Sequence, residues 1–198
     1  MKTTNHSNVV TQKRYKQSWR DGNIAATRYK RACPDARQSN KYEDINLHVD
    51  FWHEYITPEG ELRDDGVDVK GNNLPDEIWV EFANVNGKPG WTKGAAKWIA
   101  FDMCEVGGFI RVEREELLRW CYENVSPEIV RSKLKAYKKI YQRKGRQDKI
   151  TRLMLSDLRE LKSYSIIPYC MEYVTHAGEL NKVEYGHKRN RIPTSRWV

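Results

Sequence analysis

Apolar and polar residues alternate along three segments in the first half of the chain, at 45–55, 66–71 and 78–85. A period of two places successive side chains on opposite faces of an extended chain, so each segment is predicted to be a β-strand. Turn-forming Pro and Gly residues separate these segments. Further strands are predicted at 99–103, 108–112 and 150–155.

Helical spacing of apolar residues predicts helices before and after this run of strands. The first lies within 8–33, where Gly22 is expected to divide it and Pro34 to end it. The spacing of apolar residues predicts a second helix at 115–125. Ser126-Pro127-Glu128 is typical of a helix start, and an apolar stripe follows it up to Gly145. The stripe comprises Ile129, Val130, Leu134, Tyr137, Ile140 and Tyr141. A short helix is expected from the end of the last strand to Leu161.

The order of helix, strands and helices predicts an α/β fold with a central mixed sheet flanked by helices. A length of 198 residues is enough for one domain with its own hydrophobic core. We assign that domain to residues 1–176, with a core at about 43–161 and a helical segment before it. Residues 177–198 are polar and basic, and they are interpreted as a tail or arm.

An acid falls on the less aliphatic face of each of the first three predicted strands. These acids are Asp50, Asp68 and Glu81, and Lys70 shares the face of Asp68. His48 falls on the face of Asp50. If the three strands are neighbours in one sheet, the acids and the lysine converge.

Carboxylates that lie close together repel one another, and a divalent cation relieves that repulsion. An all-oxygen site suits Mg²⁺ or Mn²⁺ better than zinc, so Asp50, Asp68 and Glu81 are the candidate metal ligands. Lys70 would place a positive charge beside the reacting phosphate. The alternative is a solvated sheet face that carries an ordinary cross-strand ion pair.

The chain resembles the PD-(D/E)XK nuclease superfamily. Its signature is an Asp on one strand followed by Asp/Glu-x-Lys on the next, and here seventeen residues separate Asp50 from Asp68-Val69-Lys70. The stretches VDVKG, IWVEFANVNGKPGW and GAAKWIAFD, with YQRKGRQDKITRL at 141–153, are similar to bacteriophage members of this superfamily. The similarity covers roughly residues 45–160.

The resemblance implies a restriction-endonuclease-like core, DNA as substrate, and catalysis by Asp50, Asp68 and Lys70, with Glu81 completing the metal site. Two features depart from the family pattern. Many members place a Glu on the first helix, whereas residues 1–42 contain none, and Glu43 or Asp21 would have to serve instead. Glu81-x-Ala83 is an alternative, degraded motif. Such nucleases are frequently homodimers, since two strands need two sites, and the sequence leaves the oligomeric state open.

The net charge of +8 favours a polyanionic partner, with nucleic acid first. Between Arg131 and Arg152, ten Lys and Arg residues accompany one acid, Asp148. Such a stretch is either a phosphate-binding surface or the solvated face of an amphipathic helix. The residues predicted to contact DNA are Lys88, Lys93, Lys138, Lys139, Arg143, Lys144, Arg146 and Lys149.

Other classes of protein fit the sequence less well. No apolar run approaches the roughly 20 residues that span a bilayer, and the N-terminus lacks the apolar core of a signal peptide. The four cysteines are too far apart for a zinc knuckle and suit reduced thiols. We therefore expect a cytoplasmic protein, in the host cytoplasm if phage-encoded. The expected activity is a Mg²⁺-dependent DNA endonuclease or junction-processing nuclease. The alternative is a non-catalytic DNA-binding or adaptor protein on the same fold.

Overall fold

The computed structural model describes residues 20–72 and 74–169. It opens with a helix at residues 20–32. Ten strands follow: β1 (Arg37–Gln38), β2 (Phe51–Ile56), β3 (Leu62–Gly71), β4 (Glu77–Ala83), β5 (Trp98–Met103), β6 (Gly108–Glu113), β7 (Ser126–Val130), β8 (Lys139–Tyr141), β9 (Lys149–Met154) and β10 (Ser165–Pro168). The other helical elements are η1 (Glu43–Leu47), η2 (Trp91–Lys93), η3 (Cys104–Val106), α2 (Arg114–Asn124), η4 (Lys133–Lys135) and α3 (Leu155–Leu158).

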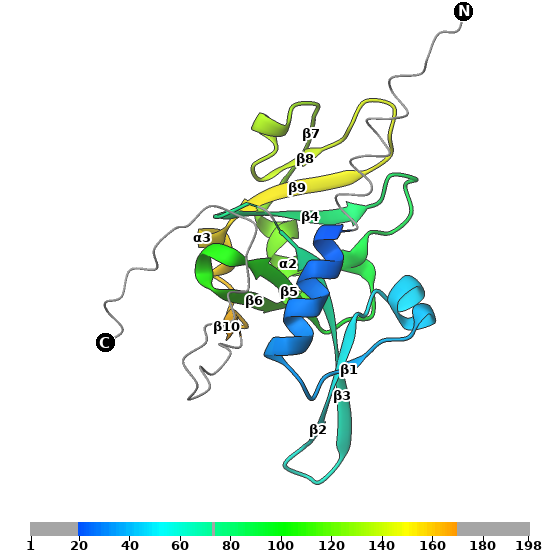
Figure 1. Ribbon diagram of the computed structural model, residues 1–198. Coiled ribbons are helices and arrows are strands. Elements are labelled where there is room, and N and C mark those ends of the chain that lie inside the picture. Colours follow the sequence, from blue (N-terminus) through cyan, green and yellow to red (C-terminus); the bar gives the residue numbers. More distant parts are fainter. Residues whose placement is uncertain (1–19, 73, 170–198) are drawn as a thin grey trace, which may run out of the picture.

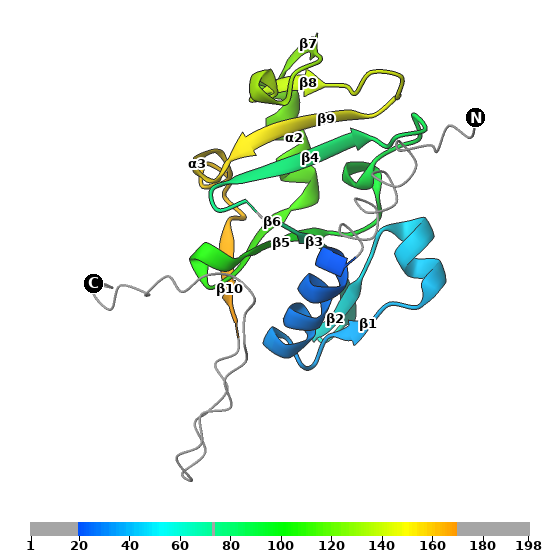
Figure 2. The ribbon, with the colours of Figure 1, turned by 45° about the horizontal axis from the view of Figure 1, so that its top comes forward.

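The strands form two sheets rather than one. The larger has the order β1-β2-β3-β5-β6-β10, and only β3 and β5 run parallel, so this sheet is mixed. The smaller has the order β4-β9-β8-β7. Figures 1 and 2 show the smaller sheet lying above the larger one. The prediction of an α/β fold with a mixed sheet and flanking helices is confirmed. The prediction of one sheet that also contains β4 is wrong.

The larger sheet is covered by apolar residues on both faces. Ala25 and Tyr29 of the N-terminal helix pack on one face, against Phe51, Val67 and other buried residues. The opposite face contributes residues such as Ile99 and Phe101 to the main core. That core also includes Leu117 and Trp120 of α2 and Ile78 and Leu153 of the smaller sheet. The two sheets therefore share one core, with α2 packed into it.

Two predicted elements differ from the structure near their ends. Residues 45–49 are not strand: η1 is a π-helical turn, and β2 begins only at Phe51. The Glu43 carboxylate at the start of η1 accepts two bonds from the Arg37 guanidinium and one from the Asn40 N–H, and this holds the turn. The first helix continues through Gly22, which therefore does not divide it. Residues 8–19 lie outside the described part of the chain, as does the predicted tail.

The helix predicted from Ser126 is also wrong. Residues 126–130 form β7, which pairs in parallel with β8 and adds to the smaller sheet. The Leu134 side chain is 84% exposed, so the apparent stripe is not a buried face. Val130 and Tyr141 instead pack with Trp79 and Ile150 of the adjoining strands. Burial against these strands outweighs the local helical signal. The predicted helix at 115–125 and the strands near 99–103, 108–112 and 150–155 are confirmed.

Candidate active site

Asp68 and Lys70 lie on β3 and point to the same side of the larger sheet, as their spacing requires. Val67 and Val69 alternate with them along β3 and pack under the N-terminal helix on the opposite face of the sheet. Asp68 is only 3% exposed, and its Oδ1 lies 2.7 Å from Lys70 Nζ. This ion pair holds the Lys70 ammonium next to the buried Asp68 carboxylate.

Asp50 lies immediately before β2, one step beyond the pairing of Phe51 with Val67. Its N–H donates to the Val67 carbonyl at 2.8 Å, and its Oδ2 accepts a 2.6 Å bond from the Val69 N–H. Burial, with the neighbouring charge of Asp68 as the next cause, raises the pKa of Asp50 to about 7. Lys70 and the Val69 N–H oppose that rise. Asp50 and Asp68 therefore form a close carboxylate pair on adjacent strands.

The charges of this pair are only partly balanced. Asp68 Oδ2 is buried and has no hydrogen-bond partner in the described part of the chain. Burial raises the pKa of Asp68, while the charge and hydrogen bond of Lys70 lower it. One ammonium thus faces two carboxyl groups, and when Asp50 is ionised Asp68 Oδ2 has no donor in the described part of the chain; a protonated Asp50 would supply one. A buried acceptor of this kind is costly unless something binds to it.

Trp91 packs its ring against the Lys70 ammonium. Its ring centroid lies 5.2 Å from Lys70 Nζ, and the side chain is buried at the start of η2. The preceding Gly90 lies so close to β4 that an added Cβ would come within 2.4 Å of the Glu81 carbonyl oxygen. Because Gly90 has no side chain, the η2 segment can pack closely against β4, and this places the Trp91 ring beside Lys70.

Glu81 belongs to the smaller sheet, so it does not share a sheet face with Asp50 and Asp68. It nevertheless approaches Lys70, whose charge lowers the pKa of Glu81, as does the charge of Arg143. Burial is the largest effect on the Glu81 carboxyl and raises its pKa. The pairing of β4 with β9 shifts register between Glu81 and Ala83, and such an irregularity can redirect a side chain. The charge of Lys70 thus acts on Glu81, whereas no contact joins the Glu81 carboxylate to Asp50 or Asp68 in the described part of the chain.

One of the two alternative acidic candidates has another role. Glu43 is engaged by Arg37, so it serves the η1 turn rather than the carboxylate pair. The backbone of Asp21 approaches β3, since an added Cβ on Gly71 would come within 2.9 Å of the Asp21 carbonyl. His48 follows η1 with a left-handed backbone, φ 53°. Burial and then the charge of Lys70 lower the pKa of His48.

Metal binding can be judged from the donor atoms. Among residues 20–72 and 74–169, no three or more His, Cys, Asp or Glu side chains form a group able to hold a metal ion. Mg²⁺, however, is commonly held by one or two carboxylates, with water and substrate phosphates completing its ligands. Asp50 and the unpartnered oxygen of Asp68 fit that role. Glu81 would add a ligand only after a rearrangement.

The predicted DNA contacts fall into two groups. Several are already engaged: Lys138 with Asp157, Lys139 with Glu128, Arg143 with Asp148, and Lys93 with the Tyr122 hydroxyl. The other four are exposed and form no ion pair within the described part of the chain. We call these four the basic rim: Lys88, Lys144, Arg146 and Lys149.

The basic rim lies on two adjacent loops and the start of β9. Gln147 N–H donates to the Val85 carbonyl at 3.3 Å, which joins the loop after β4 to the loop before β9. Lys149 pairs with Ala83 at the end of β4, two residues beyond Glu81. The rim is therefore at the Glu81 end of the smaller sheet. The basic residues between 131 and 152 are distributed over strands, loops and the short helical turn η4, not along one face of a long helix.

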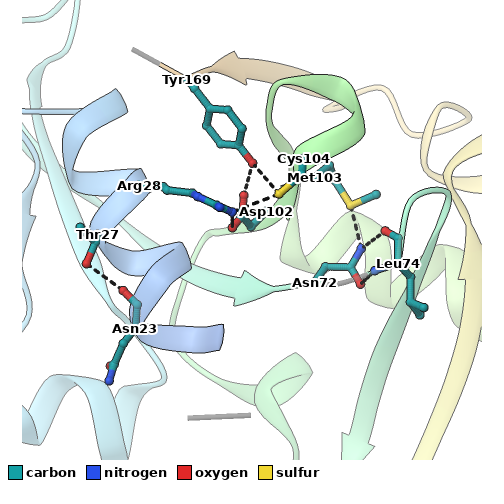
Figure 3. A network of polar contacts seen from close by, with 9 residues as sticks. All are labelled: Asn23, Thr27, Arg28, Asn72, Leu74, Asp102, Met103, Cys104 and Tyr169. Carbon is teal, nitrogen blue, oxygen red and sulfur yellow. Dashed lines mark hydrogen bonds and ion pairs between the residues drawn. The ribbon is translucent and has the colours of Figure 1, made fainter. Parts of the chain in front are cut away.

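A second polar cluster lies on the other face of the larger sheet (Figure 3). Buried Asp102 receives hydrogen bonds from the Tyr169 hydroxyl and from Arg28 of the N-terminal helix, the latter at 2.8 Å. Arg28 also donates to Cys104 Sγ at 3.0 Å and lies over the Tyr169 ring. Because all of these groups have partners, the cluster is a clamp that fastens the helix to the sheet. No local sequence signal links residues so far apart.

No protein-family model, curated protein or solved structure matches the chain. The resemblance to PD-(D/E)XK nucleases therefore stays a prediction. In the described part of the chain, no helix combines the length and apolar character needed to cross a bilayer.

Proposed function

We propose that this protein is a divalent-metal-dependent DNA nuclease that hydrolyses phosphodiester bonds with Asp50, Asp68 and Lys70. The observation that carries the proposal is the buried carboxylate pair, in which Asp68 Oδ2 has no donor and Asp50 has a pKa of about 7. Such an arrangement lowers stability in the absence of a cation. Perturbed acids of this kind are typical of functional sites.

Each residue of the site has a different role in the proposed hydrolysis. Asp50 and Asp68 would hold Mg²⁺ or Mn²⁺, which supplies Lewis-acid polarisation of a phosphate and activation of water. Lys70, fixed by Asp68 and the Trp91 ring, presents its ammonium where charge grows on the phosphate oxygens. Glu81 lies in the other sheet within the influence of the Lys70 charge, and it would orient a water molecule only if its carboxylate turned towards this position.

The basic rim supports DNA as the substrate. Its four exposed cations lie at the end of β4 that carries Glu81, so a bound backbone could extend from the rim towards the carboxylate pair. Phosphate contacts by Lys and Arg supply most sequence-independent affinity for DNA. The net charge of +8 acts in the same direction.

One observation favours the second candidate, a non-catalytic DNA-binding or adaptor protein. Lys70 Nζ already lies 2.7 Å from Asp68 Oδ1, so the lysine partly neutralises the carboxylate that a metal would need. In a binding protein this ion pair would be the final state of the site. In the nuclease, a cation would compete with Lys70 for Asp68.

Cleavage and metal binding by two variants distinguish these candidates. Wild type is incubated with supercoiled, linear, single-stranded and branched DNA, with Mg²⁺ or Mn²⁺ and with EDTA. Asp68→Asn removes a ligand at nearly constant volume, and Lys70→Ala removes the ammonium. Both are expected to abolish cleavage while DNA binding persists. Asp64→Asn, an exposed acid on the same strand, serves as the control and should cleave normally.

Thermal unfolding supplies a readout that does not depend on choosing the right DNA. A cation that binds only the folded protein raises its stability by mass action. Wild type should gain stability in millimolar Mg²⁺ or Mn²⁺, and Asp68→Asn should not. Absence of both metal stabilisation and nicking in wild type would leave the binding protein as the better description.

A further inference from the structure

A pocket of about 340 Å³ lies on the side of the larger sheet that faces away from the candidate active site. Its lining residues are His53, Tyr55, Asp65, Lys97, Trp98 and Arg111. His53 pairs with Asp65 across β2 and β3, so both share the face of Phe51 and Val67. Asp68 and Lys70 point to the opposite face, and the pocket is therefore a separate feature of the protein.

Arg111 is the cation that makes this pocket unusual. Its guanidinium carbon lies 4.5 Å from the Trp98 ring centroid, so the aromatic face fixes the plane of the group. Arg111 Nε donates to Ser165 Oγ at 3.2 Å. Across residues 20–72 and 74–169, the terminal nitrogens have no hydrogen-bond acceptor, and no acid lies within ion-pair distance. The guanidinium is thus oriented but retains unused donors.

The acid in the pocket does not offset this charge. Asp65 accepts from Lys97 Nζ at 2.8 Å and from the Trp98 indole N–H at 3.0 Å. His53 is linked to the Tyr29 hydroxyl at 2.9 Å, and burial followed by the charge of Arg111 lowers the pKa of its ring. Because Lys97 is paired with Asp65, the positive charge of Arg111 has no counter-charge among the residues that line the pocket. The pocket therefore carries a net positive charge.

We infer that this pocket binds a phosphate group, either as inorganic phosphate or as part of a small nucleotide. Arginine presents parallel donors that match two oxygens of a phosphate, and the donors of Arg111 are already oriented. The charge of Lys97 is balanced by Asp65, so Arg111 is the cation that attracts the anion. A phosphate group is favoured over a carboxylate because it carries more acceptor oxygens and, as a dianion, more charge. The Tyr55 ring adds apolar surface to the pocket lining, and the volume is enough for a nucleoside monophosphate. This inference does not depend on the proposed nuclease activity.

Isothermal titration of the full chain tests the assignment with three probes: inorganic phosphate, a nucleoside monophosphate and acetate. Phosphate should bind more tightly than acetate. A further gain with the nucleoside monophosphate identifies a nucleotide as the ligand, and equal affinities identify phosphate alone. Arg111→Gln should weaken phosphate binding by about tenfold or more, because a charge-assisted hydrogen-bond pair is lost.

Three further variants make the result specific. Arg111→Lys keeps the charge and loses the planar fork, so it should recover only part of the affinity and also shows whether loss in Arg111→Gln reflects misfolding. Arg63→Gln removes a nearby exposed arginine and should leave binding unchanged. Asp64→Asn changes an exposed acid outside the pocket lining and should also leave it unchanged. Wild-type affinity in Arg111→Gln, no phosphate binding by wild type, or loss of binding in Arg63→Gln would each overturn the inference.

Discussion

Replacing Asp50 with Asn should stabilise the metal-free protein at neutral and alkaline pH. Folding raises the pKa of this carboxyl from 3.8 to about 7, so the folded state disfavours its charged form. Asn has nearly the same volume and stays neutral. Its side-chain oxygen can still accept the hydrogen bond that the Val69 N–H donates at 2.6 Å. The substitution therefore removes an unfavourable charge and keeps the local geometry.

The size of the effect follows from the linkage between proton binding and folding. Because the folded pKa is raised, stabilisation by the protonated carboxyl is complete below pH 3.8 and is lost as the pH rises through about 7. A shift of about three pKa units corresponds to about 4 kcal/mol in the free energy of unfolding. Between about pH 5 and about pH 8, the advantage of Asp50→Asn should therefore grow by about 2 to 3 kcal/mol.

Urea denaturation of both proteins across this pH range, in the presence of a chelator, measures the difference. Contributions from other titrating groups are common to both proteins and cancel, apart from Asp68, which gains from the same substitution. Asp64→Asn on the exposed hairpin is the matched control and should show no such pH-dependent gain. If the advantage of Asp50→Asn did not change with pH, or if the variant were less stable at high pH, the account of the carboxylate pair would be wrong.

Two further predictions concern the clamp and the basic rim. Arg28→Met should lower the free energy of unfolding by about 3 kcal/mol, since buried Asp102 loses its ion pair, whereas exposed Arg31→Met on the same helix should change it little in urea denaturation. Charge reversal of Lys144 and Arg146 should weaken DNA binding for all sequences alike and flatten its dependence on salt in fluorescence titrations; an unchanged salt slope would exclude the rim from the DNA-binding surface.

Local sequence determined which side chains could act together on a single strand. The alternation around Asp68 and Lys70 places both on one face of β3, because successive residues of an extended chain point in opposite directions. The same rule placed Asp50 beside them once β2 and β3 paired. Strands β2, β3, β5 and β6 and helix α2 were predictable for the same reason, since their periodicity reflects burial on a defined face, whereas β1 and β10 were not predicted.

Tertiary structure decided everything that depends on which segments meet. The periodicity of β4 fits either sheet, and only its pairing with β9 placed Glu81 in the smaller sheet, away from the strands of Asp50 and Asp68. The segment from Ser126 has a helical pattern, yet it became strand because neighbouring strands offered it a surface to pack on. Arg28 and Asp102, like Arg111 and Asp65, are far apart in the sequence, so their contacts leave no local pattern. The physical reason is that the apolar periodicity of a segment depends on the environment of that segment alone, whereas a site forms only when several segments pack together.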